Sequence, residues 1–165
     1  MREAVGISRK LLCDERAAIG VLGAVSLAAV IGISALVVEY GHGLLKRSDN
    51  QRVADLAAYG GVYNTIYNAT GSIASATTSG KSAAINIAAL NGLTGDGVTI
   101  TSDIVMSPRR PENNAMQVTV TTNLPMYLAE MLLASTTLPV TATSDAEIVP
   151  APPGSVGPPT VALVQ

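Results

Sequence analysis

The sequence predicts an α+β protein that one long helix holds in a membrane, and two features carry this prediction. The first is the run from Ala17 to Val38, in which 22 consecutive residues include no charged side chain. The second is a set of three later segments in which apolar and polar residues alternate, as they do in strands of a sheet with one covered face. We therefore expect a membrane anchor followed by a small domain of helices and about three strands.

The uncharged run has the length of a transmembrane helix. At about 1.5 Å per residue it spans roughly 33 Å, against about 30 Å for the hydrocarbon core of a bilayer. A cleaved signal has a shorter apolar region followed by a small-x-small site, which the sequence after Val38 does not offer. A core helix that is apolar on every face would need a larger surrounding domain. Residues 17–38 are thus expected to cross a lipid bilayer once.

Small side chains recur at every fourth position of this run. They are Gly20, Ala24, Ala28 and Gly32. Such a row lets a second helix come close in lipid, which makes these residues a candidate helix-packing face. Alanine and glycine are also common in any membrane span, so a simple compositional explanation stays open.

The basic residues around the run indicate its orientation. Lysine and arginine collect on the cytoplasmic side of membrane helices. Four precede the run and three follow it closely: Arg2, Arg9, Lys10 and Arg16, then Lys46, Arg47 and Arg52. Residues 1–16 are therefore expected to form a cytoplasmic stub, with the larger C-terminal part of the chain exported across the membrane.

Helical spacing of apolar residues continues beyond the run. It predicts an amphipathic extension over residues 39–67, with a bend at Gly41 and Gly43, because two close glycines weaken a helix. The small polar residues 68–80 indicate a loop. A short helix from Ser82 to Leu90 should follow, closed by Asn91-Gly92.

Three alternating segments complete an α+β domain over residues 68–149. They are Val98 to Met106, Met116 to Leu124 and Leu138 to Ile148. The connection from Pro125 to Thr137 suggests a short helix with Leu128, Met131 and Leu132 on one side, and its length leaves a parallel crossover open. Asp145 and Glu147 are expected on the polar face of the last strand, serving solubility or edge protection. Residues 150–165 are rich in proline and glycine and are expected to be disordered.

Composition and motifs favour a protein that is not an enzyme. The net charge of -2 argues against nucleic acid as a partner. One histidine, His42, and one cysteine, Cys13, stand on opposite sides of the expected span and cannot form a zinc site or a nucleophilic pair. Ser79-Gly80-Lys81-Ser82 is similar to the end of a phosphate-binding loop, but Ser75 stands where that loop needs glycine. We expect no cofactor, no metal and no small-molecule substrate.

The residues around the junction of span and extension resemble those of a known family. They are Arg16-Ala17-Ala18, Glu39, Lys46-Arg47, Gln51, Ala54-Asp55 and Ala57-Ala58. In this order they resemble the TadE/TadG-like proteins of Flp (tight adherence) pilus assembly, and most closely the N-terminal region of TadG. The likeness covers roughly residues 14–149, with Asn50 where an apolar residue is usual in the family.

This resemblance implies a pilin-like architecture and a non-enzymatic component of a type IV-like pilus machine. It also implies a place in the bacterial inner membrane, with the C-terminal domain in the periplasm. Its partners would be the lipid bilayer and other pilus-assembly membrane proteins or pilins. The alternative is a single-pass exported binding module or receptor unrelated to pili, with the sheet face and the loop SPRRPENN, residues 107–114, as its contact. An anchored hydrolase is a third possibility, disfavoured because the sequence offers no nucleophile and base pair.

Overall fold

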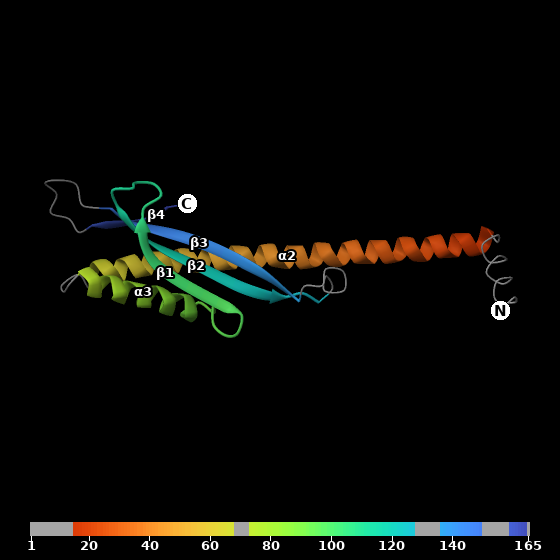
Figure 1. Ribbon diagram of the computed structural model, residues 1–165, viewed down its shortest axis with the longest axis horizontal. Helices are drawn as coiled ribbons and strands as arrows, with labels where there is room; N and C mark the ends of the chain where they lie inside the picture. The colour runs from red at the N-terminus through yellow and green to blue at the C-terminus, as the bar shows by residue number, and fades with distance from the viewer. Residues whose placement is uncertain (1–14, 68–72, 128–135, 150–158, 165) are drawn as a thin grey trace, which may run out of the picture. The chain divides into compact units, whose positions relative to one another are not determined.

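The computed structural model describes residues 15–67, 73–127, 136–149 and 159–164 (Figure 1). It contains two helices, α2 (Glu15–Tyr67) and α3 (Ile73–Leu90), and one sheet of four strands. The chain divides into two compact units. The first, the anchor unit, comprises Met1–Gly41 with Met126–Thr136, and the second, the sheet unit, comprises His42–Pro125 with Thr137–Gln165. The α+β class predicted from the sequence is confirmed.

The first part of α2 is one apolar helix with its side chains exposed. It is long and apolar enough to cross a membrane, and none of its most apolar stretch is buried by other parts of the protein. A core helix of a soluble domain would be mostly covered. The exposure of large side chains such as Leu22, Leu27 and Ile31 is therefore compatible with a single-pass membrane anchor.

The glycines expected to mark a bend do not interrupt α2, which is helical from Glu15 to Tyr67. Gly43 is buried instead, and a Cβ atom added there would lie 3.2 Å from Cδ2 of Leu138. Because glycine has no side chain, it lets the start of the third strand approach the helix closely. Gly43 thus serves packing, and the helix continues through it.

The second part of α2 is amphipathic, as predicted, and supplies much of the core. Its buried residues lie at helical spacing: Val53, Ala54, Ala57, Ala58 and Val62. They cluster with Ala84 and Ala88 of α3 and with the inner face of the sheet. Because phenylalanine and tryptophan are absent, small residues fill this core and the backbones come close together.

Helix α3 begins nine residues before the predicted Ser82, so the expectation of a loop over 68–80 is wrong for residues 73–80. Residues 68–72 lie outside the described part. The sequence of this stretch is small and polar, but Ala76, Gly80, Ala84 and Ala88 form a buried stripe at four-residue spacing. Tertiary contact along this stripe outweighs the weak helix propensity of the threonines and serines around it.

The end of α3 follows the prediction. Gly92 has a φ of +91°, the left-handed conformation that ends many helices, and the N–H of Leu93 donates to the carbonyl of Ala88 over 3.2 Å.

The three expected strands are confirmed as β1 (Val98–Met106), β2 (Asn114–Pro125) and β3 (Thr137–Val149). Each pairs antiparallel with the next, so the connection between β2 and β3 is no parallel crossover. Most of that connection, with the short helix expected there, lies outside the described residues.

A fourth strand, β4 (Thr160–Val164), corrects the expectation that the whole C-terminal tail is disordered. It pairs antiparallel with residues 145–149 of β3. The prediction of disorder rested on the overall proline and glycine content of residues 150–165. It overlooked the five residues TVALV at 160–164, whose β-branched side chains favour a strand.

The outer face of the sheet carries two rows of threonines. Residues opposite each other on neighbouring strands point to the same side. The register places Thr99, Thr121 and Thr141 in one row and Thr101, Thr119 and Thr143 in the next. Hydroxyl groups meet in pairs, at 3.1 Å between Thr119 and Thr143 and 3.0 Å between Thr121 and Thr141. This polar face is the solvated side of the sheet that the alternation predicted.

Candidate functional site

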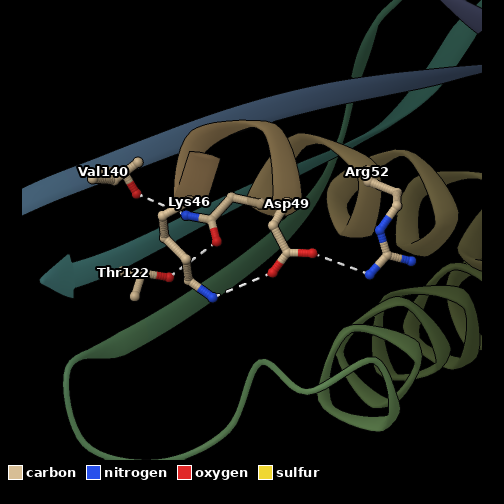
Figure 2. A network of polar contacts seen from close by, with 6 residues as sticks. Lys46, Asp49, Arg52, Thr122 and Val140 are labelled. Atoms are coloured by element: carbon tan, nitrogen blue, oxygen red, sulfur yellow. Dashed lines mark hydrogen bonds and ion pairs between the residues drawn. The ribbon is translucent and has the colours of Figure 1, made fainter. Parts of the chain in front are cut away.

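The candidate site is the predicted junction segment of α2, and its centre is a buried amide. Asn50 has no exposed surface. Its Nδ2 donates to the carbonyl of Val140 over 3.0 Å, and its Oδ1 accepts from Oγ1 of Thr122 over 3.2 Å (Figure 2). Thr122 and Val140 face each other across β2 and β3. One side chain of α2 therefore binds two strands at once.

The next residue extends this contact to the surface. Nε2 of Gln51 donates to the carbonyl of Thr143 on β3 over 3.1 Å and to Oδ1 of Asp55 over 2.9 Å. The structure thus brings together Gln51 and Asp55, two of the predicted junction residues. We name Asn50, Gln51, Thr122, Val140 and Thr143 the helix–sheet clasp.

A chain of charges lies on α2 beside the clasp. Asp49 accepts from Nζ of Lys46 over 3.3 Å and from the guanidinium of Arg52 over 3.1 Å (Figure 2). The hydrogen bond from Arg52 is the main cause that lowers the pKa of Asp49, and Lys46 adds to the effect, while slight burial opposes it. These pairs join neighbouring turns of one helix and support it where the apolar core begins.

This charge chain gives a pH-dependent prediction. Because the pKa of Asp49 is lower in the folded protein, its contribution to stability is present above the carboxyl's ordinary pKa and is lost as the pH falls through the folded value. Asp49→Asn should therefore lower the free energy of unfolding at pH 7 by less than about 1 kcal/mol, as for other exposed pairs. The melts of the two proteins should differ above about pH 4 and converge only as the pH falls further, through the lowered pKa of Asp49. A difference that stays constant across this range would contradict the assignment.

The remaining predicted junction residues have two different roles. Ala54, Ala57 and Ala58 are completely buried in the core. Glu39 belongs to the anchor unit, where its Oε1 accepts from the backbone N–H of Tyr127 over 2.8 Å. The junction is therefore no single site, because it combines a buried packing face, a polar clasp and a separate contact at Glu39.

The predicted helix-packing face lies on the exposed part of α2. Gly20, Ala24 and Ala28 are exposed, and Gly32 is partly covered. A Cβ atom added to Gly20 would meet no atom within 4 Å. The use of this face for helix association stays a prediction.

No described residues form a group of three or more histidine, cysteine, aspartate or glutamate side chains that could hold a metal ion. The SGKS stretch lies inside α3 and forms no phosphate-binding loop. Its lysine, Lys81, pairs with Asp103 of β1 at 2.8 Å, and its carbonyl accepts from Oγ of Ser102. These contacts attach α3 to the edge strand of the sheet.

The expectation that Glu147 faces solvent is wrong. Glu147 is buried and accepts a hydrogen bond from Nδ2 of Asn113, which lies in the connection between β1 and β2. Strand β4 places Ala162 opposite it, so β3 is no edge at this point. Asp145 on the same face is partly exposed and accepts from Gln117 over 3.1 Å.

Sequence reasoning missed two buried polar contacts of the sheet unit, at Asn50 and at Glu147. For Asn50 a signal existed, because it stands three residues before Val53 and four before Ala54, on the face of the helix that the apolar spacing predicts to be buried. For Glu147 and Asn113 there was no local signal, since their sequence separation is 34 residues. The burial of Glu147 depends on strand β4 and on a loop that the alternation pattern does not describe.

Comparisons of this chain with models of known protein families, with curated proteins and with solved structures gave no match.

Proposed function

We propose that this protein is a non-enzymatic, membrane-anchored component of an Flp-type (tight adherence) pilus machine. The apolar part of α2 holds it in the bacterial inner membrane, and the sheet unit in the periplasm contacts pilus subunits or other assembly proteins. The resemblance of residues 14–149 to TadE/TadG-like proteins supports this proposal, as does the succession of a long helix and an antiparallel sheet.

The observation that carries the proposal is that the two parts of α2 have different surroundings. Its first part exposes uncharged apolar side chains to the surroundings, and its second part is fixed to the sheet by buried alanines and by the helix–sheet clasp. A cleaved signal is not expected to form one continuous helix with the core of the domain that follows it, as α2 does. A chain with such a helix suits a fixed component of an envelope assembly.

Membrane attachment is tested by washing membranes with alkaline carbonate. The intact chain should stay in the membrane fraction, because the uncharged helix is held by the hydrocarbon core rather than by charge. Protease added to spheroplasts should then remove the sheet unit and spare residues 1–16. Release of the whole chain by carbonate would refute the anchor, and protection of the sheet unit would refute the orientation.

The pilus role is tested separately. The detergent-solubilised protein should co-purify with proteins of the pilus assembly platform, and deletion of its gene should reduce piliation. A variant with Gly20, Ala24 and Ala28 changed to leucine tests the small-residue face of the span. It keeps the span apolar and fills that face with larger side chains. Loss of co-purification in this variant would support helix association through that face. Normal piliation after deletion would refute the pilus role, and an exported binding module would then be the better proposal.

A further inference from the structure

The two edges of the sheet differ in what covers them. At one edge, β1 is attached to α3 by the ion pair of Lys81 and Asp103 and by the hydrogen bond from Ser102. At the other edge, β4 is hydrogen-bonded to β3, and no hydrogen bond joins β4 to any other part of the described chain. The outward N–H and C=O groups of β4 are therefore open to a further strand.

The sequence of β4 does not protect this edge. Open edges are usually guarded by a charged side chain, by a proline within the strand or by a bulge. Residues 160–164 read TVALV, with no charge and no proline, and they pair with β3 without a bulge. Five extended residues present an edge of about 17 Å. Such an edge is suited to β-augmentation, in which an extended peptide adds a strand through main-chain hydrogen bonds.

The connection between β1 and β2 lies beside the C-terminal end of β4 (Figure 1). Pro108 and Arg109 of this connection line a pocket of about 460 Å³ together with Leu163 and Val164 of β4. This volume is within the range of pockets that bind small ligands. A strand added to β4 would therefore meet Arg109 where it passes the end of β4.

Hydrogen bonds fix the backbone of this connection. Oγ of Ser107 accepts from the N–H groups of Arg109 and Arg110, both over 3.3 Å. The N–H of Asn113 donates to the carbonyl of Arg110 over 2.9 Å. The side chain of Asn113 donates to Glu147, in the part of β3 that pairs with β4. A binding group on a backbone held in this way needs little further ordering when a ligand arrives.

The charge of the connection indicates the chemistry of the ligand. The guanidinium groups of Arg109 and Arg110 make no ion pair with a described residue, and Glu112 in the same connection pairs with neither. Lys81, the other basic residue beyond α2, is paired with Asp103. A guanidinium at a pocket is suited to a carboxylate, which it binds through two parallel hydrogen bonds.

We propose that the open edge of β4 and the pocket at Arg109 together bind an extended acidic peptide segment of a partner protein. The segment adds a strand beside β4, and one of its carboxylate side chains binds Arg109. A second copy that paired through its own β4 would leave Arg109 without a counter-charge, because residues 150–164 contain no acidic residue. The inference goes beyond the proposed function, which leaves the contacts of the sheet unit open, and it does not depend on the pilus role.

Peptide binding to the full-length protein in detergent tests this site. The probe is a fluorescent eight-residue peptide of alternating valine and threonine that ends in two glutamates, with both termini capped. The matched control peptide ends in two glutamines. We expect the glutamate peptide to bind at least about tenfold more tightly, as for hydrogen bonds to a charged group. Its binding should also slow amide hydrogen exchange in residues 160–164.

A charge reversal tests the role of Arg109. Arg109→Glu should lower the affinity for the glutamate peptide at least about tenfold and favour a peptide that ends in two lysines. The Arg109 side chain is exposed, so the fold should tolerate this change. Arg47→Glu is the matched control, because it makes the same change of charge at an exposed residue of α2 outside the proposed site. It should leave both affinities within about twofold at physiological salt.

Modified peptides test the added strand. N-methylation of the four central residues removes the main-chain donors that β-augmentation needs, so it should abolish binding. Binding that survives this modification would overturn the added strand. Equal affinity for the glutamate and glutamine peptides, or no binding of either, would overturn the proposal, as would dimerisation of the chain through residues 160–164. Membrane attachment and piliation are measured separately, so a negative result here leaves the proposed function in place.

Discussion

Gly80→Ala should lower the free energy of unfolding of the sheet unit by about 3 kcal/mol, the upper range for overpacking a tight interior. A Cβ atom at this position would lie 2.7 Å from the carbonyl oxygen of Gly61 and 3.2 Å from Cε of Met116. The carbonyl belongs to the backbone of α2 and cannot rotate away. The oxygen also accepts a hydrogen bond from Thr65 over 2.9 Å. The two helices would have to separate, which opens the core along the alanines of α3.

The measurement is thermal unfolding of the full-length protein in detergent, followed by circular dichroism. Gly41→Ala is the matched control, since its Cβ atom would meet no atom within 4 Å. Alanine is the better helix former, so this control should be as stable as the natural protein or more stable by up to about 1 kcal/mol. Equal melting of the Gly80→Ala variant and the natural protein would show that α2 and α3 do not pack through these glycines.

Asn50→Ala should destabilise the sheet unit by about 3 kcal/mol. The substitution removes both hydrogen bonds of the Asn50 side chain, leaves the hydroxyl of Thr122 in a closed interface and creates a small cavity. Gln51→Ala is the control on the neighbouring residue, where the lost bonds are near solvent, and should cost less than about 1 kcal/mol.

A double-mutant cycle identifies the contact itself. Thr122→Val keeps the shape of the side chain and removes its hydroxyl. If the bond between Asn50 and Thr122 contributes, the two substitutions together should cost at least about 0.5 kcal/mol less than the sum of their separate effects. Strict additivity would contradict a direct contact, and a stable Asn50→Ala variant would contradict the clasp as a whole.

The features that were predictable depend on local pattern. The uncharged run is continuous over 22 residues, and the amphipathic continuation and the three alternating strands each repeat a period over nine residues or more. Each of these elements is present. The end of α3 at Asn91-Gly92 was likewise predictable from neighbouring residues alone. The candidate junction was predictable as a set of residues, because Gln51, Asp55 and the buried alanines do lie where α2 meets the rest of its unit.

The features that were missed depend on distant partners. The start of α3 needs the backbone of α2 against Gly80, and β4 needs the free part of β3 before its five residues can form a strand. Glu147 and Asn50 are polar residues whose burial is acceptable only because Asn113, Thr122 and Val140 complete their hydrogen bonds. Asn113, Thr122 and Val140 each lie more than 30 residues along the chain from the residue that they bind.

The sequence by itself determined the membrane-type helix, the class of the domain and the side of each strand that faces the core. These follow from the period of hydrophobic residues, which backbone geometry converts directly into a buried or exposed face. The tertiary structure alone decided the order of the strands, the pairing of β4 with β3 and the hydrogen bond from Tyr127 to Glu39. Each of these depends on hydrogen bonds between groups far apart in the chain, for which a single sequence contains no periodic signal.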